Sequence, residues 1–396
     1  MTAPALPPLI SSDGHLEVRP ERWTPRMPAR YRERAPRTVK LADGGDAILV
    51  EGQAPYPAPF LDLRAGRTNE TWQPFAATVD DTAGVGPPEQ RLQEQDLDGL
   101  LAEVLFPNMQ VGPRLWRGIA DDDLYRATVR AYNDWLGEEY CPVSPDRLIG
   151  LGVIPWTSVD DAIAELHHCA KLGLRGVNLG VFPSGRSYPT PEDDRFWAAA
   201  IAMRMPLTVH VGFDRLGPRA AQPTFEYPGA DPELLKKVGP RKIVDWVALP
   251  FLGIAPALSM AQLTLSGVFD RLPDLEIFFA ETRLGWVPFW MEEADYWYER
   301  HRHWSERLLG FRPPRAAAQR LRAAAHLLQR AARRAGGHRA APPSGRRPHH
   351  VRHRLPAHRV RLAEHAPVCR AAARRRARGR GVPDRERQRA GFLPPA

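Results

Sequence analysis

The sequence predicts an α/β protein of the (β/α)8-barrel class, and two observations lead to this prediction. Short apolar segments alternate along residues 9–309 with longer segments of helical periodicity, which is typical of a parallel sheet built from βα units. Six such units can be counted, whereas a closed barrel needs eight. The second observation is an abrupt change of composition near Arg315, at the place where the last two units are expected.

The six expected strands are short apolar runs, several of them bounded by Gly, Pro or a polar residue. The first begins at Leu9 and ends at His15, and the fifth carries the segment Thr-Val-His210-Val-Gly. In chain order the strands are expected over residues 9–15, 102–107, 148–154, 176–181, 206–212 and 275–281.

Helical segments follow these strands. An acidic triplet at residues 121–123 suits the start of a helix over 120–140, because carboxylates there compensate the helix dipole. Ser158 is a typical N-cap of the next helix, and Gly173 is a natural stop for it. Residues 20–95 are rich in Pro, Arg and Gly, so an irregular excursion with some ordered turns is expected there. The remaining helices are expected over residues 191–203, 244–252, 256–269 and 287–309.

Residues 315–396 differ from the rest of the chain in composition. They hold 22 Arg, no Lys and three acidic residues, a net charge of +19, whereas residues 1–314 have a net charge of −10. They also lack Ile, Met, Asn, Thr, Trp and Tyr, and a segment with so few large apolar groups is expected to be disordered. The predicted organisation is an incomplete barrel over residues 1–314 followed by an Arg/Ala/Pro-rich tail over 315–396.

Two hypotheses explain this tail. Dense Arg is typical of an arm that binds nucleic acid, because it releases counterions from phosphates. Alternatively, the tail is a shifted reading frame of a GC-rich gene, in which chance codons encode mainly Arg, Ala, Pro and Gly. Codons for residues 349–365, read one base later, permit Ile-Met-Phe-Gly-Thr-Asp-Tyr-Pro-His-Thr-Glu-Ser-Asp-Trp-Pro-Asn-Thr.

Three side chains at predicted strand ends have the donor types of a metal site. Asp13 and His15 are two residues apart on the first strand, so they point to the same side and can reach one ion. His210 lies at the end of the fifth strand, and active sites of barrels lie at the C-terminal ends of their strands. Each residue alone is more often structural, but together they predict a metal site. Mixed oxygen and nitrogen donors suit Zn²⁺ or Mn²⁺.

The segments around these residues resemble the amidohydrolase-related family of metal-dependent hydrolases, in the subgroup near aminocarboxymuconate-semialdehyde decarboxylase and the aromatic-acid decarboxylases. The resemblance implies a barrel whose metal ligands include Asp13, His15 and His210. It also implies hydrolysis or non-oxidative decarboxylation of a small carboxylated substrate. Relatives often have a histidine where this chain has Glu281, which is expected to bind metal or act as a base. The matching segments are Ile10–His15, Ala102–Asn108, Gly152–Trp156, Gly173–Asn178, Val209–His210, Phe279–Trp286 and Tyr298–Trp304.

The shifted string is similar to the same family, whose barrels carry a (Ser/Thr)-Asp-(Tyr/Phe)-Pro-His segment on the seventh or eighth strand. The Asp of that segment is the last family ligand, and its shifted codon straddles Arg354 and Leu355. We therefore favour a frameshift, after Trp304 and before about Gln329, over nucleic-acid binding. The prediction for this polypeptide is a barrel without its last two strands and with little or no activity.

Three further residues are candidates for substrate binding. Asn108 and Trp156 follow the second and third strands, and Arg283 follows the sixth. The alternatives are core packing for Trp156 and a loop ion pair for Arg283. The tract His301-Arg-His303-Trp304 lies on an outer helix and is expected to pack or to contact a second subunit, so a homodimer is a further expectation.

Cysteine content and hydropathy indicate the cellular compartment in which the protein is expected. Cys141, Cys169 and Cys369 form no paired framework. No apolar run is long enough to span a bilayer, and no N-terminal segment resembles a signal peptide. A cytoplasmic protein with reduced thiols and no membrane partner is expected.

Overall fold

A computed structural model describes residues 9–58, 78–79, 84–109, 112–213, 233, 256–282 and 285–309, with side chains to residue 304. The chain divides into two units, residues 1–360 and 361–396, and the second lies wholly outside the described residues. The tail over 315–396, the expected helix over 244–252 and Arg283 also lie outside them.

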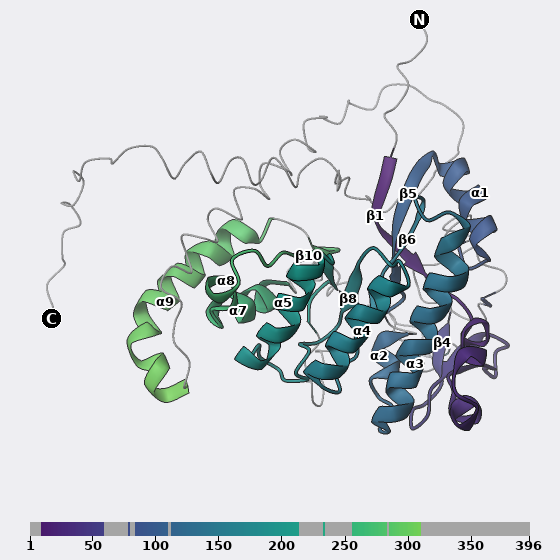
Figure 1. Cartoon of the computed structure of the whole chain (residues 1–396), viewed down its shortest axis with the longest axis horizontal. Coiled ribbons are helices and arrows are strands. Elements are labelled where there is room, and N and C mark those ends of the chain that lie inside the picture. Colours follow the sequence, from purple (N-terminus) through teal and green to yellow (C-terminus); the bar gives the residue numbers. More distant parts are fainter. Residues whose placement is uncertain are drawn as a thin grey trace, which may run out of the picture. The chain divides into compact units, whose positions relative to one another are not determined.

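The parallel strands follow one another in chain order (Figure 1). One sheet has the order β1-β5-β6 and the other β10-β9-β8-β7, and β6 and β7 are separated by a single residue, Leu151. The Leu151 amide donates to Leu105 in β5 and the Gly152 amide to Gly176 before β8, so this one segment connects the two sheets. The parallel strands are β1 Leu9–Leu16, β5 Leu100–Pro107, β6 Leu148–Gly150, β7 Gly152–Val153, β8 Val177–Leu179, β9 Leu207–His210 and β10 Ile277–Ala280.

The six predicted strands are therefore confirmed, with β6 and β7 together forming the third. Within the described part of the chain, β1 pairs with β5 alone and β10 with β9 alone, so the barrel is not closed there. Its interior is a small apolar cluster of Val104, Phe106, Leu151 and Ala280. The larger core lies between the outer side of the strands and the helices, and includes Trp135, Leu166 and Trp197.

Two helices start where the sequence predicts, at the acidic triplet of residues 121–123 and at Ser158. Asp121 caps α3 by accepting from the amides of Asp123 and Leu124 at 3.0 and 3.2 Å. Ser158 caps α4 by accepting from the Asp161 amide at 3.0 Å. Gly173, two residues beyond α4, has φ 78°, as the predicted helix stop requires. The helices are α1 Pro88–Asp98, α2 Pro113–Trp116, α3 Asp122–Trp135, α4 Val159–Lys171, α5 Asp194–Met203, α7 Pro256–Leu265, α8 Val268–Arg271 and α9 Val287–Leu309.

Residues 20–95 contain more order than their composition predicts. Three short 3-10 helices, Pro20–Arg22, Thr24–Arg26 and Ala29–Arg34, precede a small antiparallel sheet, and α1 follows it. The sheet is centred on the fully buried carboxylate of Asp46, which pairs with Arg19 at 3.2 Å and Lys40 at 2.8 Å. Its strands are β2 Arg37–Lys40, β3 Asp46–Leu49 and β4 Tyr56–Ala58.

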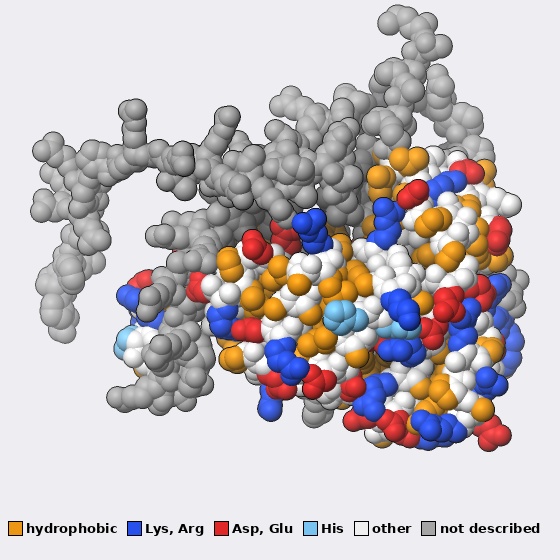
Figure 2. Space-filling view, in the orientation of Figure 1, with side chains coloured by type: hydrophobic (Ala, Val, Ile, Leu, Met, Phe, Trp, Pro, Cys, Tyr) orange, Lys and Arg blue, Asp and Glu red, His pale blue; other side chains and the backbone are white. Residues whose placement is uncertain are grey.

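The face formed by α3, α4 and α5 carries charges of both signs side by side (Figure 2). Neighbouring helices are joined by ion pairs, such as Arg126–Asp161 at 3.1 Å and Arg195–Asp160 at 2.5 Å. This face therefore has no single-sign surface of the kind that attracts a phosphate backbone. Among the described residues, no helix combines the length and the apolar character needed to cross a membrane.

Candidate metal centre

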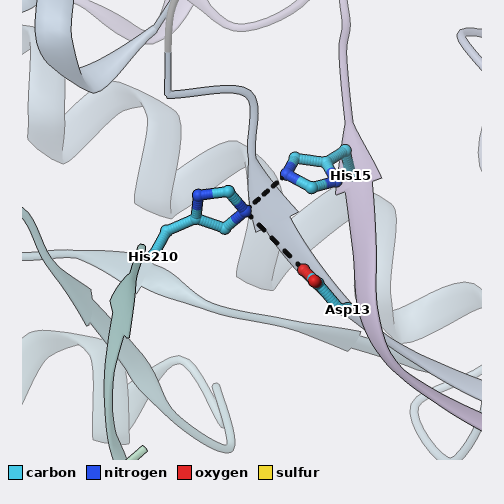
Figure 3. A group of neighbouring side chains, drawn as sticks. All are labelled: Asp13, His15 and His210. Atoms are coloured by element: carbon cyan, nitrogen blue, oxygen red, sulfur yellow. Dashed lines mark hydrogen bonds and ion pairs between the residues drawn. The ribbon is translucent and has the colours of Figure 1, made fainter. Parts of the chain in front are cut away.

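Asp13 and His15, in the second half of β1, converge with His210, the last residue of β9 (Figure 3). Asp13 and His15 project from the same side of β1, and His210, the last residue of β9, meets them from the facing side. Nε2 of His210 lies 2.8 Å from Nε2 of His15 and 3.7 Å from Oδ1 of Asp13. One ligand atom from each of the three residues lies within 4.8 Å of the other two. The predicted donors are thus brought together, because the sheet curves enough for strand one to face strand five.

The protonation states at this point suit a cation. The pKa of His15 is lowered to about 4, mainly by burial and also by the charges of His210 and Arg91, while Asp13 partly offsets these effects. His15 is therefore neutral near pH 7, and a neutral imidazole is the form that binds metal. Oδ1 of Asp13 is buried and has no hydrogen-bond partner among the described residues. A buried carboxylate oxygen without a donor is costly unless a cation completes the site, so the donor set fits a metal ion.

The chain is strained directly beside these ligands. Val211, which follows His210, has φ 66°, and Glu281, which follows β10, has φ 54°. Left-handed backbone is unusual for any side chain and rarer for a β-branched one, at a cost of about 1–3 kcal/mol each. The two residues sit at the same level, since the Val211 amide donates to the Ala280 carbonyl at 3.0 Å. This turn places Oε2 of Glu281 3.9 Å from Nε2 of His210, with its side chain 34% exposed.

A buried ion pair supports the β1 ligands. Arg91 of α1 donates to Glu103 of β5 at 2.7 and 3.2 Å, and Gln95 donates to the same carboxylate at 2.9 Å. A Cβ at Gly14, between the two β1 ligands, would lie 3.3 Å from both partners of this pair. Glycine therefore lets the ion pair pack directly against the strand that carries Asp13 and His15.

The three weaker candidates have different surroundings. The Asn108 amide donates to Oε2 of Glu17 at 3.0 Å. Trp156 packs near Tyr125, with ring centroids 6.0 Å apart, and its indole N–H is buried without a partner in the described part of the chain. Arg283 lies outside the described residues. Substrate binding by these residues stays a prediction.

Two polar residues near the site were not predicted. Glu17 is buried and lies two residues after His15, as His15 lies two residues after Asp13. This spacing of two is the signal in the sequence that could have predicted it. Asn178 of β8 is 1% exposed, and its Oδ1 has no partner among the described residues. No local signal in the sequence marks Asn178, because its burial depends on packing between strands.

The histidine tract on α9 has a packing role in the described structure. His301 stacks on Trp297 with ring centroids 5.2 Å apart and accepts a hydrogen bond from the Trp304 indole at 2.9 Å. Within the described residues, the group with the spacing of metal ligands is the one at Asp13, His15 and His210. Subunit contact through α9 stays a prediction.

A parallel α/β barrel with carboxylate and imidazole donors converging at its strand ends defines the class of metal-binding barrel proteins. A family model described as Amidohydrolase matches residues 71–340, and the chain belongs to this family. The predicted family and fold class are confirmed.

Three relatives illustrate the similarity. Over 141 residues, the chain is 28% identical to 2-amino-3-carboxymuconate-6-semialdehyde decarboxylase of Dictyostelium discoideum, a match spanning 35% of this chain and 33% of that protein. An amidohydrolase of Mycobacterium avium subsp. paratuberculosis K-10 superposes with a TM-score of 0.54 at 17% identity, covering 76% of this chain and 79% of that one. A 5-carboxyvanillate decarboxylase of Novosphingobium aromaticivorans, solved with manganese, has a TM-score of 0.44 at 23% identity over 59% of each chain. The second likeness supports the barrel fold.

Proposed function

We propose that residues 1–314 form the body of a mononuclear metal-dependent enzyme that acts on a small carboxylated substrate. The observation that carries this proposal is the convergence of Asp13, His15 and His210 within 4.8 Å, where the buried Oδ1 of Asp13 accepts no hydrogen bond from the described residues. Family membership supports the same class of chemistry. Between the two expected reactions we favour non-oxidative decarboxylation, in keeping with the name of the partly matching Dictyostelium relative.

In this proposal, one set of residues binds the metal ion and another holds the metal ligands in position. Asp13, neutral His15 and His210 would hold the ion, and oxygen and nitrogen donors together suit Zn²⁺ or Mn²⁺. The ion, when bound, supplies Lewis-acid stabilisation of negative charge on substrate oxygens. The buried pair of Arg91 and Glu103 fixes β1, so that both of its ligands keep their orientation.

Glu281 is the proposed proton-transfer group. Its carboxylate lies 3.9 Å from Nε2 of His210 and is partly open to solvent, so it can exchange protons. After loss of carbon dioxide the substrate carbon needs a proton, and a carboxylic acid beside the ligand set can deliver it. If Glu281 binds the ion instead, it serves as a fourth donor.

We further propose that residues 315–396 are an out-of-frame product, so this polypeptide lacks the last ligand and has little activity. Among the described strands, β1 and β10 each have one edge without a strand partner, and such edges would also favour aggregation. Sequencing the coding DNA across codons 300–396 tests this directly. A single-base discrepancy that restores the Asp-Tyr-Pro-His segment would support the frameshift. An unchanged sequence, with salt-dependent nucleic-acid binding lost on deleting 315–396, would favour the alternative.

Metal binding tests the site independently of turnover. Zn²⁺ and Mn²⁺ affinities are measured by chelator competition on the full chain and on Asp13→Asn and His210→Gln. We expect about one ion per chain, and at least about tenfold weaker binding in both variants. His301→Gln is the matched control, because that histidine lies on α9. This variant should bind the metal ion as tightly as the wild type does. Equal metal affinities in the wild type and the three variants would refute the metal site. Separately, release of carbon dioxide by the metal-loaded full chain at a rate typical of enzymes would refute the predicted inactivity.

A further inference from the structure

An arginine that no motif marked lies at the mouth of the barrel. Arg117 follows α2, far in sequence from the metal ligands, and its guanidinium reaches Gly180, the residue directly after β8. A Cβ on Gly180 would overlap Nη1 of Arg117, so the arginine occupies the space that any other residue would fill. Glycine at position 180 is therefore a requirement of this arrangement.

The sheet register places Gly180 at the level of the metal site. Leu179 is paired with Val209, so the next residues, Gly180 and His210, lie level on neighbouring strands about 4.8 Å apart. Side chains at the same level of adjacent parallel strands point to the same face, and His210 points toward His15. Arg117 therefore extends over the same face, one strand away from the metal ligands.

The neighbouring wall is suited to a flat organic group. Burial raises the pKa of the Tyr125 phenol, and the positive charge of Arg117 acts on this pKa in the opposite direction. Tyr125 in turn lies against Trp156. The indole N–H of Trp156 and Oδ1 of the buried Asn178 have no partners within the described part of the chain. A cation, an aromatic ring and unused polar groups thus line the ends of adjacent strands.

We propose that Arg117 is a substrate-binding residue that holds a carboxylate of a planar substrate beside the metal centre, with Gly180 providing the space for it. A guanidinium presents paired donors that match a carboxylate, and the nearby Trp156 ring provides a face for a planar group. This inference rests on the proposed function for the identity of the site, but anion binding can be measured without metal.

The test uses benzoate and its uncharged counterpart benzamide on the metal-free full chain, with dissociation constants measured by ligand-observed NMR. Benzoate should bind more tightly than benzamide to wild type. In Arg117→Met, benzoate should bind about tenfold or more weakly, while benzamide changes by less than about twofold. Gly180→Ala should reproduce this loss, because the added methyl displaces the flexible end of Arg117 while the strand keeps its place.

Arg175→Met is the matched control, since Arg175 is an exposed arginine at the opposite end of β8, paired with Asp146. It should bind both probes as wild type does. Circular dichroism establishes that each variant is folded, and Arg117→Lys should retain part of the preference for benzoate. Unchanged benzoate binding in folded Arg117→Met or Gly180→Ala, equal binding of the two probes, or no binding to wild type would each overturn the proposal. Zn²⁺ affinity is measured in parallel. If the wild-type protein does not bind Zn²⁺, the proposed function is refuted, but the preference for benzoate over benzamide still decides the role of Arg117.

Discussion

Substitution of Asn133 is expected to be among the most destabilising in the described barrel, although Asn133 is not one of the three metal-site residues. Its side chain is fully buried and bonds to both backbone groups of Val153, accepting from the amide at 2.8 Å and donating to the carbonyl at 2.9 Å. It also donates to Oε1 of Glu165 at 2.8 Å. The β5–β6 ladder ends at Gly150, and β7 pairs with β8 on its other edge, so Asn133 stands in for a strand partner.

The Asn133→Ala substitution leaves three polar groups without this partner. A buried unsatisfied group costs about 1–3 kcal/mol. The Glu165 carboxylate contributes least of the three groups, because it keeps a second partner in Arg130 at 2.8 Å. We therefore expect the free energy of unfolding to fall by about 3–5 kcal/mol. That is a large part of the stability of a typical domain, about 5–15 kcal/mol.

Urea unfolding followed by circular dichroism measures this change. Thr128→Val is the control on the same helix, because Thr128 is equally buried but its hydroxyl donates to the Leu124 carbonyl of its own helix and so joins no other segment in the described structure. It should cost about 1 kcal/mol. If Asn133→Ala were no worse than Thr128→Val, the view that Asn133 replaces a strand partner would be wrong.

Three further predictions follow from the site and the core. Because the pKa of His15 is about 4 in the folded chain and near 6.5 when unfolded, the metal-free protein should lose up to about 3 kcal/mol of stability as pH falls from 6.5 to 4. His15→Gln should flatten this dependence, and urea midpoints across that pH range check it; parallel curves would contradict the assignment. Burial raises the pKa of Cys141 to about 11 and that of Cys169 well above its usual value, so iodoacetamide at pH 7.5 should label neither until urea unfolds the chain, as peptide mass mapping would reveal. Glu281→Gly should raise the free energy of unfolding by up to about 1 kcal/mol, because glycine tolerates φ 54°, and unchanged or lower stability in the same urea assay would argue against strain there.

The strands, helices and ligand candidates could be predicted because their signals are local. Alternation of apolar segments predicts six strands in the observed order, and helices start at the acidic triplet of residues 121–123 and at the N-cap Ser158, as expected. The α9 helix has the predicted bounds, Val287–Leu309. Each of these features depends on residues within a few positions of one another.

Order within residues 20–95 was underestimated for equally physical reasons. The strands β2, β3 and β4 include Arg37, Lys40, Asp46 and Pro57, residue types that are not typical of strands, and they depend on the buried charge of Asp46. The α1 helix is polar and lacks apolar periodicity, although Pro88 at its start and Gly99 after its end were available signals.

The sequence alone determined which donors exist, on which strands they end, and that composition changes near Arg315. Tertiary structure decided that β1 faces β9 closely enough for Asp13, His15 and His210 to converge, and that burial keeps His15 neutral. It also decided that Arg117 lies over Gly180. The reason is that sheet curvature, desolvation and side-chain contacts across nearly 200 residues arise from packing between segments, which no local pattern records.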